Sequence, residues 1–250
     1  MDAIKTLLDH DAARWIIGKI EHLEGRSKFC AHNAIRFLQW ADEIFETSHP
    51  VASFCAMHAT EEAVASFISA AKMHDHKDCA KKVNLHDHPS KALVSLLVQR
   101  LSRIAKEADL AIAVNSSESG LVLRIPIGGN FEYRELHLSI FRAHQNTGQD
   151  IDKHIPLGEL PNLRELKAEV EKVADARNKL LYASDKGLPP GFIEPEKSLI
   201  RETQLSLGLI WAAIDLHMHH DQETPFVRNL LGQMAAFNAT RKKKKSSSEQ

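Results

Sequence analysis

The sequence predicts an all-α protein, an up-down helical bundle that carries one β-hairpin insertion. Apolar residues recur at spacings of three and four along most of the 250 residues, as on the buried face of a helix. The apolar period shortens to two only near residues 120–141. Hydrophobic residues make up 43% of the chain, which is enough for one sizeable core. We therefore expect a single helical domain over residues 1–240, with the insert at about 116–160, and a disordered basic tail at 241–250.

Three helices are predicted before residue 74, at 2–23, 27–47 and 50–73. Gly25 separates the first two, because glycine commonly marks the end of a helix. The third begins at Pro50, whose missing backbone N–H is tolerated in the first turn of a helix. A polar, histidine-rich stretch at 74–90 follows these helices.

A fourth helix is predicted at 90–114, and the apolar period then changes. Every second residue from Leu121 to Ile127 is a large aliphatic one, and the turn sequence Gly128-Gly129-Asn130 comes next. This pattern predicts the β-hairpin. Pro126 lacks the backbone N–H that a central strand needs, so we expect its strand at the edge of the sheet.

The C-terminal part is predicted to hold helices at 162–184, 195–219 and 225–240. Gly187 and the prolines that follow it end the first of these. The expected up-down core combines five helices, at 27–47, 50–73, 90–114, 162–184 and 195–219.

Composition and charge exclude several classes of protein. The net charge is −1, but the last ten residues carry +4, which leaves −5 on the body of the chain. Any RNA contact of the body therefore needs a local positive patch. Three scattered cysteines without CxxC spacing favour a reducing compartment. No run approaches the ~18 apolar residues of a membrane span, and the N-terminus lacks a signal pattern, so we expect a cytoplasmic protein without membrane contact.

Two predicted helices carry charged residues on otherwise apolar stripes. The stripe of helix 50–73 includes His58 and Glu61, with Glu62 beside them, and the stripe of helix 162–184 includes Arg177. A buried carboxylate needs a partner, and an Arg on a facing helix would form a bidentate pair with Glu61. Each residue also has a plain structural interpretation, in which Glu61 is an ion-pair partner and Arg177 extends its charged group into water. Together they would alternatively line a cleft for phosphate or a nucleobase.

These segments resemble the AbiV-type abortive infection proteins of the HEPN superfamily. The resemblance covers roughly residues 28–82 and 165–190. It rests on Asn33-Ala34 through Ala41, on Ser53 to Ala71 with Ala59-Thr60-Glu61-Glu62-Ala63, on Asp75-His76-Lys77, and on Arg177-Asn178-Lys179-Leu180-Leu181-Tyr182. It implies a HEPN-like bundle and a bacterial defence or toxin-type protein that acts on RNA or translation. It also places Glu62, His76 and Lys77 among the binding residues.

HEPN ribonucleases carry an Arg, a polar residue directly after it, and a His that is separated from the Arg by four to six residues. Arg177 and Asn178 match this pattern, whereas Tyr182 stands at the first place where the His is expected. The resemblance implies that Arg177 binds phosphate, that Asn178 orients it, that Tyr182 occupies the catalytic corner, and that Glu61 and His58 hold Arg177. Because an unperturbed Tyr has a pKa near ~10, it is a poor general base at neutral pH. Binding of RNA or nucleotide is therefore at least as well supported as cleavage.

Two other interpretations stay open. The fifteen histidines form clusters with aspartates, at His74-Asp75-His76, at His86-Asp87-His88 and between His217 and Asp221. Because imidazole and carboxylate ligands suit Zn, Mn or Fe, one alternative is a metal-dependent phosphohydrolase, with His58, His74-Asp75, and Asp109 or Asp215 as candidate ligands. The other alternative is a noncatalytic scaffold, as a homodimer, that recognises a protein partner through the hairpin. The preferred interpretation assigns neither a metal nor a cofactor.

Overall fold

The computed structural model describes residues 2–74, 76–85, 88–107, 109–142, 155–156, 168–173 and 194–248. Arg177, Asn178 and Tyr182 lie outside the described residues, as does most of the helix predicted at 162–184, of which residues 168–173 are helical. The described chain is mostly helical and carries one small antiparallel sheet. No helix in these ranges combines the length and the apolar character that crossing a membrane requires.

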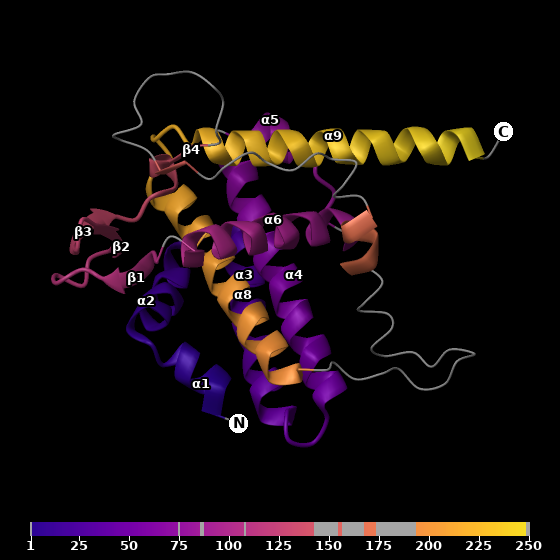
Figure 1. Ribbon diagram of the computed structural model, residues 1–250. Helices are drawn as coiled ribbons and strands as arrows, with labels where there is room; N and C mark the ends of the chain where they lie inside the picture. Colours follow the sequence, from indigo (N-terminus) through magenta and orange to yellow (C-terminus); the bar gives the residue numbers. More distant parts are fainter. Residues whose placement is uncertain are drawn as a thin grey trace.

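Three long helices form the centre of the molecule: α3 (Gly25–Ile44), α4 (His49–Met73) and α8 (Pro195–Met218). They lie side by side in Figure 1, with α4 in contact with both neighbours. The buried face of α4 consists largely of alanines, which allow the backbones of α3 and α8 to approach closely. Pro50 lies in the first turn of α4, as predicted.

The N-terminal segment folds as two helices instead of the one predicted at 2–23. They are α1 (Asp2–Leu8) and α2 (Asp11–Lys19), and the short 3-10 helix η1 (Ile20–His22) continues α2. The break is stabilised by His10, whose Nδ1 accepts a hydrogen bond from the backbone N–H of Ala12 and caps α2. Apolar side chains on both sides of this break, among them Ile4 and Ile20, are fully buried.

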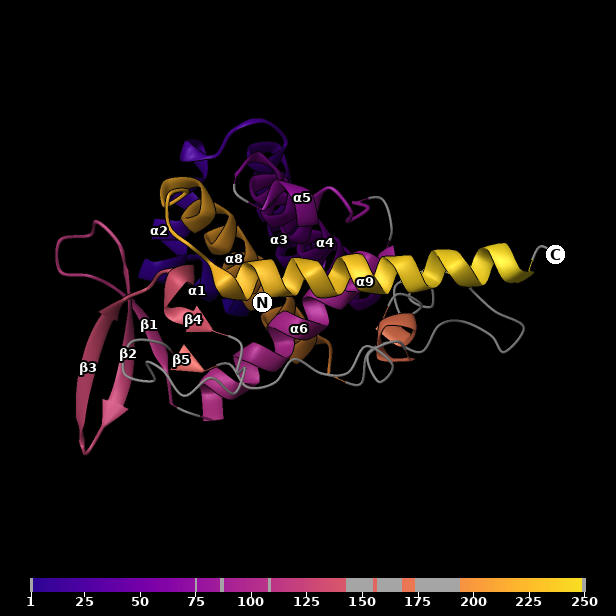
Figure 2. The same ribbon diagram turned by 90° about the horizontal axis from the view of Figure 1, so that it is seen from above.

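Three further helices are α5 (Lys77–Ala80), α6 (His88–Glu107) and α9 (Pro225–Ser248). α5 and α6 pack on α4, and α9 packs on α5 and α6. Figures 1 and 2 show α6 and α9 running across the long central helices, with the C-terminal half of α9 extending beyond the body of the protein. The prediction of a short last helix and a disordered tail is wrong for residues 241–248, because α9 continues through the basic run. Its many lysines are compatible with helix, since Lys has a high helix propensity.

The sheet has the strand order β1-β2-β3, with β1 (Ala111–Val114), β2 (Leu121–Ile127) and β3 (Asn130–Glu135) all antiparallel. The hairpin is confirmed, whereas the helix predicted at 90–114 ends at Glu107 and its last residues form β1. Pro126 lies in the middle strand instead of an edge strand. However, β1 ends opposite Arg124, so at Pro126 β2 has only β3 as a neighbour and the missing N–H leaves no partner unsatisfied.

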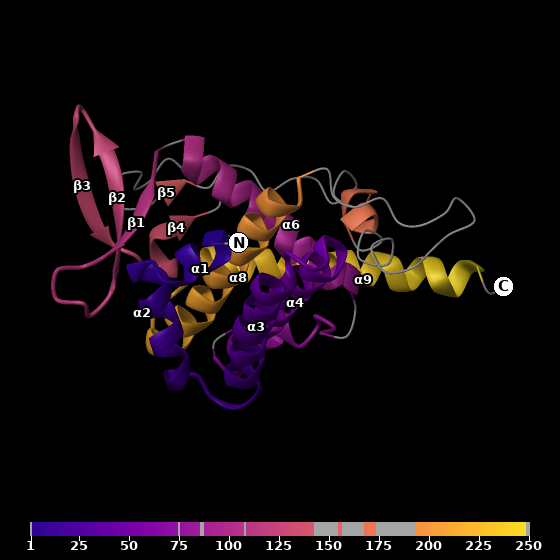
Figure 3. The same ribbon diagram turned by 90° about the horizontal axis from the view of Figure 1, so that it is seen from below.

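The sheet packs against the C-terminal end of α8 through short connecting elements. Leu121, Leu123 and Leu136 are buried, and the segment after β3 contains the 3-10 helix η2 (Leu138–Ile140). A two-residue parallel pair follows, β4 (Phe141–Arg142) with β5 (Ile155–Pro156). Figure 3 shows the β2–β3 hairpin projecting from one side of the helical body. The sheet thereby places the residues that follow β3 against the end of α8.

Candidate functional site

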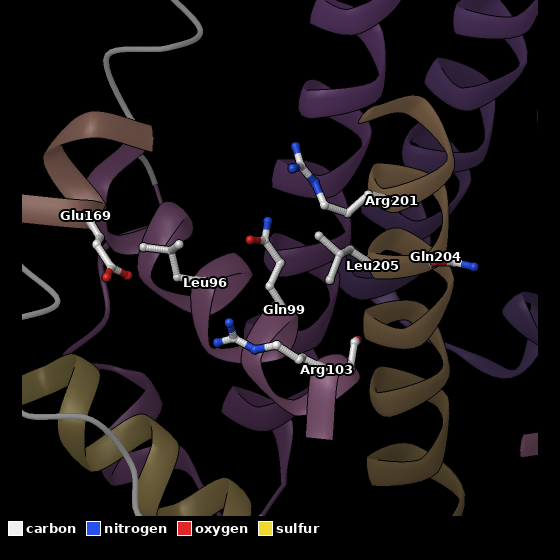
Figure 4. Close-up of a pocket in the computed structure, with 8 residues that line it drawn as sticks. Leu96, Gln99, Arg103, Glu169, Arg201, Gln204 and Leu205 are labelled. Carbon is white, nitrogen blue, oxygen red and sulfur yellow. The ribbon is translucent and has the colours of Figure 1, made fainter. Parts of the chain in front are cut away.

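A cleft of about 400 Å³ lies between α6 and α8. Figure 4 shows the side chains that border it. They are Leu96, Gln99, Ser102 and Arg103 from α6, Arg201, Gln204 and Leu205 from α8, and Glu169 from the helical residues 168–173. Two guanidinium groups, two amides, a hydroxyl and the carboxylate of Glu169 therefore belong to the lining, and N–H donors such as those of the guanidinium groups recognise oxyanions.

The spacing of the lining residues explains why they face one space. Gln99 and Arg103 are four residues apart and thus share one face of α6, while Arg201 and Leu205 do the same on α8. Leu96 and Leu205 are buried and form the apolar part of the lining, whereas Arg103 and Ser102 are exposed. The cleft therefore combines apolar walls with polar groups that water and a ligand can reach.

Arg201 is oriented by a buried carboxylate on the same helix. Its Nε and Nη2 donate to Oε1 of Glu202 at 3.2 and 2.9 Å, and Nη2 also lies 3.3 Å from Oγ of Ser198. The Glu202 side chain is 8% exposed, while that of Arg201 is 51% exposed. The guanidinium is thus fixed on one side and open to the cleft on the other.

The same carboxylate joins α8 to α4. Thr60 donates its hydroxyl proton to Oε2 of Glu202 at 2.7 Å, and its oxygen lies 3.2 Å from Oγ of Ser206. All three side chains are buried. Since a buried carboxylate is costly unless it is paired and hydrogen-bonded, this network explains how α8 tolerates Glu202 in its apolar face.

The sequence predicts an Arg–Glu pair between Glu61 and Arg177. Arg177 lies outside the described residues, and the carboxylate of Glu61 contacts two other side chains. Nδ1 of His88 is 3.0 Å from Oε1 of Glu61, and Nζ of Lys91 is 3.7 Å from Oε2. These partners come from α6, so Glu61 joins α4 to α6 at the border of the core.

The predicted stripe through His58 and Glu61 is only partly buried. His58 and Glu61 are half-buried, whereas Ala65 and Ile68, which follow them on the stripe, are buried, as are alanines such as Ala59 and Ala63. Periodicity alone gave the large residues more weight than the alanines. The tight packing of α3 and α8 on the alanine face turns His58 and Glu61 to its edge.

The other predicted binding residues are dispersed. Asn33 of α3 donates to Oε2 of Glu62 at 3.2 Å. Nδ1 of His58 lies 4.0 Å from Oε2 of Glu61, and the centre of the His58 ring lies 4.4 Å from that of Phe37.

His76 lies elsewhere in the fold and is buried, with its Nε2 2.6 Å from Oγ1 of Thr224. The side chain of Lys77 lies outside the described residues. His58, Glu61, Glu62 and His76 do not border the cleft between α6 and α8.

A second polar cluster lies at the far end of α8. Nδ1 of His137 and Nδ1 of His219 each lie 3.0 Å from Oδ1 of Asp215. The backbone N–H of Leu138 donates to Oδ2 at 2.8 Å, and the carboxylate is almost fully buried. The hydrogen bond that the His137 imidazole donates to Asp215 raises the pKa of His137, because it favours the charged form.

The remaining histidines of this region form a separate group. Nε2 of His74 lies 3.2 Å from Nδ1 of His217, and the His74 ring stacks on that of His220 at 5.6 Å. The predicted cluster between His217 and Asp221 is therefore divided between two environments.

In the part of the chain that the structure describes, one group of three residues has potential metal-binding atoms close together. The group consists of His137, Asp215 and His219. Among the ligands expected for a phosphohydrolase, Asp75 is not described, while His58 and Asp109 are not part of this group.

Several of these residues were not identified from the sequence. Arg103, Arg201 and Glu202 lie in predicted helices and belong to no motif in the sequence. His137 lies outside the predicted His–Asp clusters. The spacing of four residues between Asp215 and His219 does indicate that they lie on one face of a helix.

Comparison of the chain with family models, with curated proteins and with solved structures finds no match.

Proposed function

We propose that the cleft between α6 and α8 binds a phosphate of RNA or of a nucleotide. The observation that carries the proposal is that Arg103 and Arg201, from two helices, both line one cavity of about 400 Å³. Guanidinium groups recognise phosphate oxygens with paired N–H donors and keep their charge at every physiological pH. In a body with net negative charge, the cleft brings the positive charge of Arg103 beside the Arg201–Glu202 pair and the carboxylate of Glu169.

The two arginines have different roles in this proposal. Arg201 is held by Glu202, which lowers the entropy cost of ordering its side chain when a ligand binds. Arg103 is exposed on α6 and makes no ion pair with the described residues, so its charge is available to the ligand. Gln99 and Ser102 add neutral hydrogen-bonding groups beside it.

RNA is favoured over other phosphate ligands by the resemblance to AbiV-type HEPN proteins. In the HEPN-like interpretation, Thr60 belongs to the segment Ala59-Thr60-Glu61-Glu62-Ala63, and its hydroxyl supports the carboxylate that orients Arg201. Arg177 and Asn178 follow Glu169 in the sequence by eight and nine positions, and Glu169 borders the cleft. With Tyr182 in place of the expected His, we assign the protein binding of RNA in a defence or toxin-type role, without assigning cleavage.

The test is the affinity of the protein for a short single-stranded RNA and for a mononucleotide, by fluorescence anisotropy and calorimetry. Arg103→Ala should weaken RNA binding about tenfold, since one charged hydrogen-bonding contact contributes ~1.5–3 kcal/mol. Lys106→Ala is the matched control, because Lys106 is an exposed cation of α6 that does not border the cleft. Equal affinities of the two variants, or no binding by the wild type, would refute the proposal.

A second candidate function is self-association through the hairpin. β3 is an edge strand, and its outer face exposes Phe131 and Tyr133 by 51% and 61%. An antiparallel pairing of two copies centred on Tyr133 would place Glu132 of each copy opposite Arg134 of the other, which matches opposite charges across the strands. Sedimentation should then show a dimer that Tyr133→Pro converts into a monomer. A monomeric wild type would remove this candidate.

A further inference from the structure

The cluster at the C-terminal end of α8 combines two imidazoles and one carboxylate from two distant parts of the chain. Asp215 and His219 are four residues apart on α8, so they share one face of that helix. His137 follows β3 and is brought to them by the packing of the sheet. The convergence therefore depends on tertiary structure and is independent of the cleft near Arg201.

We propose that His137, Asp215 and His219 bind a divalent first-row transition-metal ion, with Zn²⁺ as the representative. Two neutral imidazoles and one carboxylate are a donor set that suits Zn²⁺ and Fe²⁺, whereas Mg²⁺ and Ca²⁺ prefer oxygen ligands. On binding, the metal takes the place of any Nδ1 proton that lies between an imidazole and Oδ1 of Asp215. A neutral imidazole coordinates as its Nε2–H tautomer, so its proton moves from Nδ1 to Nε2 by exchange with solvent, whereas an imidazolium releases its Nδ1 proton to solvent. The Nδ1 lone pairs and the carboxylate oxygen become ligands.

The distances between the donor atoms fit a shared ion. Each Nδ1 lies 3.0 Å from Oδ1 of Asp215, and all three ligand atoms lie within 4.8 Å of one another. Two ligands that are each about 2.1 Å from a metal, at 90–110° to one another, are roughly 3.0–3.4 Å apart. The two N···O distances thus already correspond to neighbouring positions in one coordination sphere.

Groups behind the ligands hold them in this arrangement. The backbone N–H of Leu138 binds Oδ2 of Asp215 at 2.8 Å, which leaves Oδ1 directed at the imidazoles. Nε2 of His137 lies 3.4 Å from Oε2 of Glu135, so an Nε2–H can donate to that carboxylate while Nδ1 keeps its lone pair. A histidine ligand whose second nitrogen donates to a carboxylate is a common arrangement around zinc.

The cluster borders a cavity of about 180 Å³ that is also lined by Trp15, Asn115 and Trp211. With three protein ligands, a tetrahedral or octahedral ion keeps at least one position for water or an exogenous ligand. The cavity gives such a ligand room, between two indole rings and the side-chain amide of Asn115. The site has the open form of a reactive metal centre, whereas a purely structural zinc site has four protein ligands.

The experiment measures Zn²⁺ binding to tag-free protein that has been treated with a chelator, by isothermal titration calorimetry. The wild type should bind one equivalent more tightly than any further equivalents, and His219→Ala should weaken that site at least about tenfold. His220→Ala is the matched control, because His220 neighbours His219 in sequence but is not part of the cluster. Co²⁺ provides an independent readout, since its visible absorption reports nitrogen and oxygen ligation.

A second variant tests the proposal without changing a metal ligand, in case His219→Ala does not fold. Glu135→Gln keeps an exposed side chain of the same size and should weaken Zn²⁺ binding about tenfold by removing the carboxylate that faces His137. Circular dichroism of each variant confirms that the helices are intact. Absence of a stoichiometric Zn²⁺ site in the wild type, or equal Zn²⁺ affinities of folded His219→Ala and His220→Ala, would overturn the proposal. Neither result would affect the RNA-binding proposal, which rests on the other end of α8.

Discussion

The two ends of α8 differ in the partners that stabilise a buried carboxylate. Each end buries a carboxylate, Glu202 near the start of the helix and Asp215 near its end, about 20 Å apart along its axis. Glu202 is satisfied by a permanent cation and a hydroxyl. Asp215 is satisfied by two imidazoles and a backbone N–H.

This difference determines which ligands the two ends can recruit. Arg201 stays charged, so its end of the helix presents fixed positive charge to a cleft and favours an anion. Imidazoles can lose their protons and bind a metal through the same nitrogen atoms, so the other end favours a cation. One helix thereby positions two sites of opposite preference, and each can be removed by changes that leave the other intact.

The largest expected effect is the stabilisation of the protein by Zn²⁺. Free Zn²⁺ at about 1,000 times its dissociation constant would add ~4 kcal/mol to the free energy of unfolding. For a chain of this length, the melting temperature should rise by roughly 8 °C or more. Differential scanning fluorimetry should show this rise for the wild type and for His220→Ala, and its absence for His219→Ala. A rise of similar size in His219→Ala would place the ion elsewhere.

The next largest effect is the loss of stability of the metal-free protein when Arg201 is replaced. Arg201→Ala should lower the free energy of unfolding by about 1–3 kcal/mol, because Oε1 of buried Glu202 loses its charged partner. Adding Glu202→Gln should recover part of this loss, since a neutral amide is cheaper to leave underpaired. His219→Ala should cost less than Arg201→Ala, because Asp215 keeps His137 and the Leu138 N–H. Urea titration measures all three, and the reverse order would contradict the comparison.

A smaller effect is expected from the hydroxyl that joins α4 to α8. Thr60→Val removes the donor to Oε2 of Glu202 and should cost ~1 kcal/mol of stability. Thr203→Val is the matched control, since its buried hydroxyl donates only to the Leu199 carbonyl of its own helix. The same urea titrations should show the smaller loss for Thr203→Val. Equal losses would mean that the Thr60–Glu202 bond contributes nothing specific.

The smallest effect is expected at Glu61. Its carboxylate contacts His88 and the largely buried Lys91, and an amide oxygen at the same position can still accept hydrogen bonds from both, so the expected loss is at most about 1 kcal/mol. Glu61→Gln should therefore change stability by less than that and leave RNA affinity unchanged, as measured by urea titration and anisotropy. A loss of RNA affinity as large as that expected for Arg103→Ala would show that Glu61 contributes to RNA binding.

The sequence predicted the helices where periodicity is strong and local, such as His49–Met73 and Pro195–Met218. It did not predict the break after Leu8 or the strand Ala111–Val114, because a capping histidine and the pairing with β2 decide those segments. These are contacts that a one-dimensional apolar pattern does not contain.

For the candidate sites, the described residues bring together the same types of side chain at other positions than those predicted, while Arg177 lies outside the described residues. A carboxylate–Arg pair and a His–Asp cluster were both expected, yet the described carboxylate–Arg pair near the core uses Glu202 in place of Glu61. The cluster gains His137, which lies 78 residues from Asp215 in the sequence. Such long-range partners follow from how the sheet packs on α8, which spacing within one helix cannot reveal.

We propose that Arg103 and the cleft it borders bind the phosphate backbone of RNA. The affinity for a short single-stranded RNA, measured over a range of salt concentrations, tests this binding directly. The slope of log affinity against log salt should become smaller in magnitude by roughly 0.7–1 in Arg103→Ala, because one phosphate contact is lost, and should stay unchanged in Lys106→Ala. An unchanged slope in Arg103→Ala, or the same reduction in both variants, would contradict the account.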